Sequence, residues 1–179
     1  MKYLASITCL LFSLMVTVTP GCSQTIPADR GKIIDVSFDK KISGLINFTV
    51  PTIGVTELRN IHNEVFIFDT RKREEYEVSH IPGAKYLGYH DFEASRLKEV
   101  PKDAPIILYC SIGYRSEKIG EKLQALGFTN VSNLYGSIFE WANQGYPLVD
   151  NNETPTNKIH TYSKNWSKWV DETKVQKIW

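Results

Sequence analysis

Short β-rich runs alternate with helical stretches along the middle of the chain, from residue 49 to residue 143. This alternation is typical of a parallel sheet covered by helices, because each helix carries the chain back to the start of the next parallel strand. The almost wholly apolar run at 105–110 indicates a strand that is buried on both faces. The sequence therefore predicts an α/β fold. The expected strands are 49–53, 65–69, 85–88, 105–110 and 130–134, and the expected helices are 55–61, 72–79, 90–99, 114–126 and 137–143.

Composition limits the chain to one compact domain with extensions. Of its 179 residues, 42% are hydrophobic and 23% are charged, which are ordinary values for a globular protein. Lys and Arg total 21, against 20 for Asp and Glu. Such an even balance gives no electrostatic basis for binding nucleic acid or a strongly acidic partner.

The first 21 residues resemble a bacterial export signal of the lipoprotein type. A positive start at Lys2 precedes a mostly apolar run at 3–18, which is near the length of a signal-peptide core and shorter than a membrane-spanning helix. Cys22 follows small residues as in a lipobox, in which the cysteine is lipidated and becomes the mature N-terminus. Two alternatives remain open: cleavage after Ser23 by ordinary signal peptidase, and an uncleaved N-terminal anchor.

Each of these alternatives places the domain outside the cytoplasm. Ser23 follows Cys22 where an Asp would favour the inner membrane, so the lipoprotein resemblance implies a lipid anchor in the outer membrane, facing the periplasm. Ordinary cleavage would instead give a soluble periplasmic protein. Cys9 is removed with a cleaved signal. Cys110 is then the single thiol besides any lipid site, which excludes an internal structural disulfide.

Cys110 ends the apolar run at 105–110, and a helix is expected to begin about four residues later. Ligands bind at the carboxyl ends of the strands in open α/β sheets. A turn at 111–113 would point backbone N–H groups inward, and the positive end of the following helix would add to their effect. Both favour the thiolate, which is the nucleophilic form of cysteine. The alternative is burial as a small apolar side chain, which is the commonest role of a lone cysteine.

Three blocks of sequence resemble the rhodanese family. The segment 110–116, with the pattern C-x-x-G-x-R-S, resembles its active-site loop. An upstream block within 69–84 resembles its D-x-R, E-E-Y and H-I-P-G-A signatures. A downstream block within 133–147 resembles its closing N-L-x-G-G-x-x-x-W segment, with Ser137 in place of the second glycine. Three blocks in the right order are far more specific than one loop.

The resemblance implies a rhodanese-like domain at 49–149 with a three-layer fold, in which helices cover both faces of a parallel sheet of about five strands. It also implies a sulfurtransferase. Cys110 would take the outer sulfur of a donor such as thiosulfate, a persulfide or a polysulfide. The Cys110 persulfide would then pass this sulfur to a thiol or to cyanide. Such a two-step transfer predicts ping-pong kinetics and needs no cofactor.

The resemblance also assigns roles to residues around Cys110. Backbone N–H groups of the loop would hold the outer persulfide sulfur as an anion. Arg115 would bind or steer an anionic donor, unless it forms a structural pair with a carboxylate. Asp69 and Arg71, at the end of the neighbouring strand, would support the loop. No metal site is expected, because the histidines have no ligand spacing with one another or with cysteine. The predicted binding loop comprises Ser111, Ile112, Gly113, Tyr114, Arg115 and Ser116.

Other functions fit parts of the same pattern. An envelope-tethered persulfide carrier or sulfur-sensing module, with protein partners and little small-molecule turnover, needs the same cysteine and loop and stays open. Phosphatases that share this fold have five residues between cysteine and arginine, whereas this chain has the four residues 111–114, which favours sulfur transfer. A thiol redox enzyme would use a second cysteine, which the domain lacks.

Two extensions flank the domain. Residues 22–48 are interpreted as a linker that packs against the domain. Residues 150–179 are rich in lysine and hold three of the chain's four tryptophans. Trp166, Trp169 and Val170 have helical spacing. We expect this extension either to contact a membrane interface near the anchor or to pack its aromatic side chains on the domain, over the site.

Overall fold

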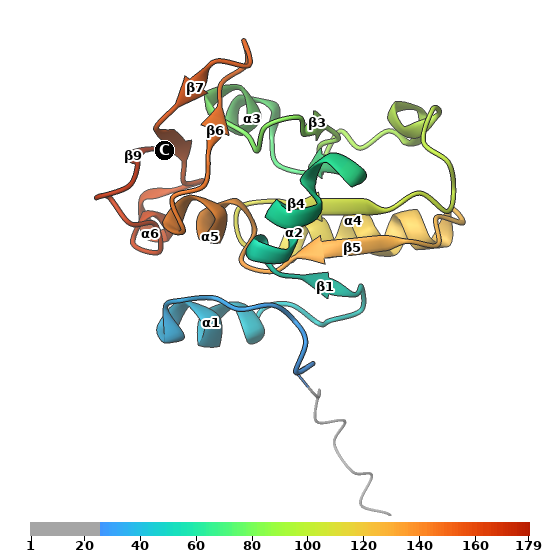
Figure 1. The fold of residues 1–179 in the computed structure, drawn as a ribbon, viewed down its shortest axis with the longest axis horizontal. Coiled ribbons are helices and arrows are strands. Elements are labelled where there is room, and N and C mark those ends of the chain that lie inside the picture. Colours follow the sequence, from blue (N-terminus) through green and yellow to red (C-terminus); the bar gives the residue numbers. More distant parts are fainter. Residues whose placement is uncertain (1–25) are drawn as a thin grey trace, which may run out of the picture.

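The computed structural model describes residues 26–179 and is built around a five-stranded parallel sheet (Figure 1). The strand order is β1-β5-β4-β2-β3, and every neighbouring pair in this sheet is parallel. This arrangement confirms the α/β fold predicted from the sequence. The strands, in spatial order, are β1 Thr52–Ile53, β5 Val131–Leu134, β4 Ile106–Tyr109, β2 Phe66–Asp69 and β3 Lys85–Tyr86.

The central strand is β4, and all four of its side chains are buried. It pairs with β2 on one side and with β5 on the other. Successive side chains of a strand point to opposite faces of the sheet. Accordingly, Ile107 and Tyr109 belong to one hydrophobic cluster, and Ile106 and Leu108 belong to another. Both faces of β4 are therefore covered, which explains why its sequence is apolar throughout.

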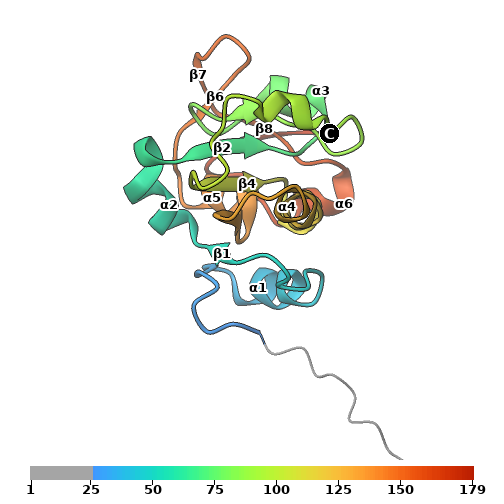
Figure 2. The same cartoon turned by 90° about the vertical axis from the view of Figure 1, so that its right-hand side faces the viewer.

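Helices cover the two faces of the sheet, as the sequence predicted. On one face, α4 Tyr114–Ala125 packs Ile119 and Leu123 into the cluster that contains Leu108. On the other face, α2 Val55–Ile61 and α5 Ser137–Asn143 pack into the cluster that contains Tyr109. Figure 2 shows α2 and α4 on opposite sides of β4. The remaining domain elements are α3 Arg73–Val78 and the 3₁₀ turns η1 His62–Glu64 and η2 Ala94–Leu97.

The helix predicted at 90–99 is wrong, because this segment forms a loop that contains the short turn η2. Side-chain hydrogen bonds replace the helical backbone pattern there. The Asp91 carboxylate accepts the Tyr86 hydroxyl at 2.9 Å, and Arg96 Nη1 donates to the Leu87 carbonyl oxygen at 2.7 Å. Aspartate competes with helix formation through such local bonds.

The N-terminal extension contains a helix that the sequence did not predict, α1 Val36–Ser43. Asp35 caps its first turn, because its carboxylate accepts the backbone N–H of Phe38 at 3.0 Å. Phe38 and Ile42 lie one turn apart and are fully buried. The Phe38 ring centroid lies 6.5 Å from that of Phe139 in α5, so the extension packs on the domain.

The C-terminal extension folds back onto the same region. Trp166 and Trp169 pack against the main core, and Trp169 stacks on Phe38 with 5.5 Å between ring centroids. These contacts agree with the expectation that the extension packs on the domain. Its strand β7 Pro155–Thr156 pairs with β6 Leu148–Val149 at the end of the domain, and its strands β8 Lys158–His160 and β9 Gln176–Ile178 pair with each other. Helix α6 Lys164–Ser167 lies between β8 and β9 in the chain.

The predicted signal peptide at 1–21 and the predicted lipid site Cys22 lie outside the described residues, so both stay predictions. Cys9 lies outside them as well. Within the described part of the chain, Cys110 is a free cysteine. No helix in residues 26–179 has both the length and the apolar character needed to cross a membrane.

Replacing Trp169 with alanine is expected to lower the free energy of unfolding by about 2 to 3 kcal/mol, because it removes the ring that stacks on Phe38 and leaves a cavity. Urea unfolding followed by circular dichroism measures this change. Trp179→Ala is the matched control, since its side chain is 59% exposed and its loss should change stability by less than about 0.5 kcal/mol. Equal effects of the two substitutions would contradict a structural role for Trp169.

Candidate active site

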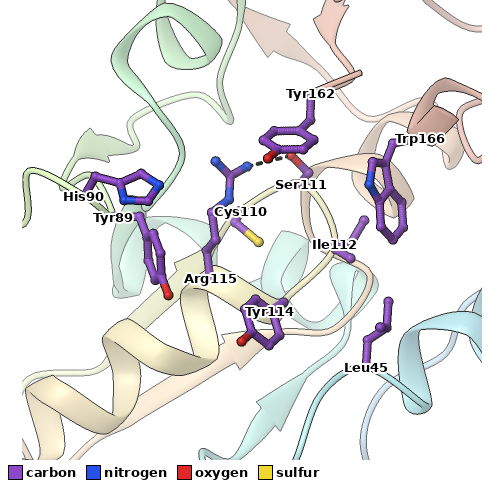
Figure 3. A pocket seen from close by; sticks show the side chains of 10 residues that line it. All are labelled: Leu45, Tyr89, His90, Cys110, Ser111, Ile112, Tyr114, Arg115, Tyr162 and Trp166. Carbon is purple, nitrogen blue, oxygen red and sulfur yellow. Dashed lines mark hydrogen bonds between the residues drawn. The ribbon is translucent and has the colours of Figure 1, made fainter. Parts of the chain in front are cut away.

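Cys110 lies directly after β4, at the carboxyl edge of the sheet. The residue is 1% exposed, yet it lines a pocket, as Figure 3 shows. The chain turns after Cys110, and α4 begins at Tyr114. Gly113 takes a φ of 113° in this turn, which side chains disfavour, and its N–H donates to Cys110 Sγ at 3.2 Å. The loop therefore curves around the sulfur.

The surroundings of Cys110 favour its thiolate. Burial by itself would raise the pKa of the thiol, because burial disfavours the charged form. The positive charge of Arg115 and the backbone N–H groups of Ile112, Ser116 and Gly113 outweigh burial, so the Cys110 pKa lies below its ordinary value. A larger thiolate fraction at neutral pH makes Cys110 a stronger nucleophile.

Arg115 is held by a carboxylate that the sequence analysis did not assign to the site. Glu75 of α3 forms a bidentate ion pair with it: the distance is 2.7 Å from Nη1 to Oε2 and 3.0 Å from Nη2 to Oε1. Arg115 Nη2 also donates to Ser111 Oγ at 2.9 Å (Figure 3), and the Ser111 hydroxyl donates to Glu75 Oε1 at 3.3 Å. This network joins α3 to the loop. The E-E-Y signature that contains Glu75 was the sequence signal for it.

The Glu75–Arg115 pair is fully charged at neutral pH. Burial would raise the pKa of Glu75, but the hydrogen bond and charge of Arg115, with the charge of Arg71, lower it to about 2. The pKa of Arg115 is raised, because its hydrogen bond to Glu75 and the negative charges nearby outweigh the opposite effect of burial. The two charges therefore compensate each other. This geometry matches the structural-pair alternative for Arg115, and its role in binding an anionic donor stays a prediction.

Hydrogen bonds of three buried residues, Ser116, Asn133 and Ser137, hold the loop that follows β4. The Ser116 hydroxyl donates to Asn133 Oδ1 at 2.7 Å, and Asn133 Nδ2 donates to the Gly113 carbonyl oxygen at 2.9 Å. The Cys110 N–H donates to Ser137 Oγ at 3.2 Å. Neither Asn133 nor Ser137 was among the predicted site residues, although both lie in the downstream block of the family resemblance.

Asp69 and Arg71 form a fully buried ion pair at the end of the neighbouring strand β2. Arg71 Nη2 donates to Asp69 Oδ2 at 2.6 Å, and both side chains are 0% exposed. Thr70, which lies between them, donates from its N–H and its hydroxyl to the Tyr109 carbonyl oxygen, each at 2.9 Å. Tyr109 precedes Cys110, so these bonds hold the end of β4. The supporting role predicted for the pair is compatible with this position and stays a prediction.

A pocket of about 370 Å³ opens in front of Cys110. Ile112 lines it from the loop, and Tyr114 and Arg115 line it from the first turn of α4. Tyr114 is 44% exposed and lies beside the opening (Figure 3). Most of the lining side chains are aromatic or aliphatic, so a ligand in this pocket would contact mainly apolar surface.

The rest of the pocket wall comes from other parts of the chain. Leu45 lines it from the N-terminal extension, and Tyr162 and Trp166 line it from the C-terminal extension. Tyr89 and His90 line it from the loop after β3. Tyr162 and Trp166 agree with the expectation that aromatic side chains of the C-terminal extension pack over the site, whereas Leu45, Tyr89 and His90 were not expected there from the sequence. Within residues 26–179, no three His, Cys, Asp or Glu side chains are grouped so that they could hold a metal ion.

Comparison with models of known protein families matches residues 55–144 to the rhodanese-like domain. The chain belongs to the rhodanese-like family. The matched residues include Cys110, its loop, and the supporting Glu75, Asn133 and Ser137. The rhodanese-like domain excludes Leu45, Tyr162 and Trp166, so part of the pocket wall lies outside it.

Rhodanese relatives support this assignment in sequence and in structure. A sulfurtransferase from Allochromatium vinosum is 36% identical over 86 residues, which cover 48% of this chain and 79% of that protein. The crystal structure of a rhodanese-like domain protein from Staphylococcus aureus aligns with a TM-score of 0.50 at 30% identity, covering 56% of this chain and 98% of that one. A rhodanese-like domain from Anabaena aligns with a TM-score of 0.52 at 25% identity, covering 56% and 79%.

Replacing Arg115 with methionine is expected to raise the pKa of Cys110, because the positive charge that favours the thiolate is lost. Ultraviolet absorbance of the thiolate as a function of pH measures this pKa, with the signal of Cys110→Ser subtracted. Arg115→Met leaves the Glu75 charge buried without its partner. The pKa of Cys110 is therefore also measured in the double variant Glu75→Gln, Arg115→Met. An unchanged Cys110 pKa in both proteins would refute the role of Arg115.

Stability is expected to fall between about pH 4.5 and pH 2 as Glu75 becomes protonated. The ordinary pKa of this carboxyl group is 4.5 and its folded pKa is about 2, so its contribution is complete above pH 4.5 and is lost as the pH falls through 2. Thermal unfolding at a series of acidic pH values measures the effect. The double variant Glu75→Gln, Arg115→Met should lose less stability over this pH range. If the unfolding temperature falls equally with pH in the natural protein and in the double variant, Glu75 is not the group responsible.

Proposed function

We propose that this protein is a sulfurtransferase that carries a sulfane sulfur on Cys110 as a persulfide. The observation that carries the proposal is the Cys110 thiol itself: its pKa is lowered, its Sγ accepts the Gly113 N–H, and it lines a pocket. Membership of the rhodanese-like family supports sulfurtransferase activity at a general level.

In the first step, the Cys110 thiolate attacks the outer sulfur of a donor. With thiosulfate, a bond forms between Sγ and the outer sulfur, the S–S bond of thiosulfate breaks, and its electron pair leaves with sulfite. The product is an anionic persulfide on Cys110. The backbone N–H groups of Ile112, Gly113 and Ser116 already face the thiolate, and donors fixed in advance stabilise an anion without reorganisation.

In the second step, an acceptor thiol gives its proton to the anionic persulfide, and the resulting thiolate attacks the outer sulfur of the protonated persulfide. A bond forms between the acceptor and the outer sulfur, the bond to Sγ breaks, and its electron pair returns to Sγ. The acceptor leaves as a hydropersulfide, and Cys110 is again a thiolate. Because the two half-reactions share one covalent intermediate, the kinetics should be ping-pong.

A tethered persulfide carrier or sulfur-sensing module is the second candidate function. It needs the same loaded Cys110, but its donor and acceptor would be proteins. The ion pair of Arg115 with Glu75 is the observation that favours it, because a guanidinium that already holds a carboxylate attracts a free thiosulfate anion less than an unpaired one would. Fast loading of Cys110 beside slow steady-state turnover of thiosulfate and cyanide would support the carrier.

Incubation of the purified protein with thiosulfate or polysulfide is expected to add the mass of one sulfur atom to the peptide that contains Cys110. Intact-mass measurement and peptide mapping detect this addition. Cys110→Ala should gain no sulfur at this position, and any loading of Cys22 in both proteins serves as an internal reference.

Two results would overturn the proposal. One is equal loading of sulfur on the Cys110→Ala protein. The other is hydrolysis of an aryl phosphate that depends on Cys110, since this would show that the loop serves phosphoryl chemistry.

A further inference from the structure

The pocket is assembled partly from segments outside the rhodanese-like domain. Leu45 follows α1, Tyr162 precedes α6 and Trp166 lies within α6. All three lie outside residues 55–144, which the family model matches. Figure 3 shows these three side chains along one side of the pocket, with Arg115, Tyr89 and His90 toward the other side. The extensions therefore shape the space that a sulfur donor or acceptor must enter.

Within the described part of the chain, the pocket wall offers a small anion a single cationic side chain, and that side chain is already ion-paired. Among the described residues that line it, Arg115 is the one Lys or Arg side chain. Its charge is compensated by Glu75 at 2.7 Å, and its guanidinium carbon lies 5.3 Å from the centroid of the Tyr162 ring. The Cys110 thiolate adds a negative charge at the base of the pocket. A dianion such as thiosulfate would have to give up its hydration near this charge, which is costly.

The same wall offers extensive apolar surface. Leu45, Ile112, Tyr114, Tyr162 and Trp166 contribute aliphatic and aromatic groups to a volume of about 370 Å³. A neutral apolar body gains free energy by leaving water for such a surface, and it needs no partner for a charge. Trp166 is fixed in place, because it packs against the main core and lies beneath the Lys41 ammonium at 5.9 Å from its ring centroid.

We propose that the sulfur partner of Cys110 is an organic thiol or hydropersulfide with a neutral, apolar body, and that Tyr162 and Trp166 select it. This inference rests on the proposed sulfur transfer and names the substrate class for it. As donor, the hydropersulfide RS–SH gives its outer sulfur to the Cys110 thiolate, the RS–S bond breaks, and RS⁻ leaves. As acceptor, RS⁻ takes the outer sulfur from protonated Cys110 persulfide, the Sγ–S bond breaks, and the thiolate of Cys110 returns.

Single-turnover discharge of the loaded protein tests the proposal. Cys110 is loaded with polysulfide, excess donor is removed, and the loss of the persulfide is followed by mass spectrometry with three thiols of similar acidity. Benzyl mercaptan has an apolar body, 2-mercaptoethanol has a small polar body, and 2-mercaptoethanesulfonate is anionic. Benzyl mercaptan is expected to have a second-order rate constant at least about tenfold above the other two, after correction for their reaction with a free alkyl persulfide.

Variants of the wall locate the source of this preference. Tyr162→Asn removes the ring and suits the left-handed backbone at this position, where φ is 64°. Tyr162→Asn and Trp166→Ala should each reduce the preference for benzyl mercaptan several-fold, with much smaller changes for the two polar thiols. Trp179→Ala is the matched control, since it removes a largely exposed tryptophan of the same extension, outside this pocket.

The outcomes separate this inference from the function on which it rests. If Cys110 takes up no sulfur, the sulfurtransferase proposal fails and the inference fails with it. If Cys110 loads and discharges to all three thiols at equal corrected rates, sulfur transfer stands and the apolar substrate class is wrong. If Tyr162→Asn, which changes an exposed side chain, slows all three thiols equally, the role of the wall in selection is wrong.

Discussion

The buried ion pair between Glu75 and Arg115 is the interaction on which the site depends. Its two members come from α3 and from the first turn of α4, and together they hold Ser111 in the loop between β4 and α4. A buried charge is tolerated when it is paired and fully hydrogen-bonded, and removal of one partner from such a pair typically costs about 3 to 5 kcal/mol. Because Glu75 compensates Arg115, the guanidinium can lie close to Cys110 and favour its thiolate inside the fold.

Much of the sheet could be predicted from the sequence, because its signals are local. The central strand is apolar throughout, and α5 has the bounds expected for it, 137–143. Segments that depend on distant partners could not be predicted. α1 presents two buried apolar side chains, Phe38 and Ile42, on a largely polar helix, and the rings that cover Phe38 belong to Phe139 and Trp169. In the loop around η2, side-chain hydrogen bonds overrode the helical pattern.

The residues of the candidate site likewise fall into those that could be located from the sequence and those that could not. Cys110 could be located because the end of the strand, the glycine of the turn and Arg115 are neighbours in the sequence. Glu75, Asn133 and Ser137 approach the loop from other elements, and no periodicity links them to it. The family resemblance contained these residues within its blocks but did not say what they touch. Hydrogen-bond partners of this kind are set by the tertiary fold, which parallel pairing of β2, β4 and β5 establishes.

Reactivity and pocket shape come from different stretches of this chain. The groups that favour the thiolate lie within the rhodanese-like domain, whereas Leu45, Tyr162 and Trp166 of the pocket wall lie in the two extensions, which meet where Trp169 stacks on Phe38. Substitutions in the extensions can therefore reshape the pocket wall without replacing the groups that set the acidity of Cys110. Two chains with identical reactive loops can thus differ in the space that a sulfur compound must enter.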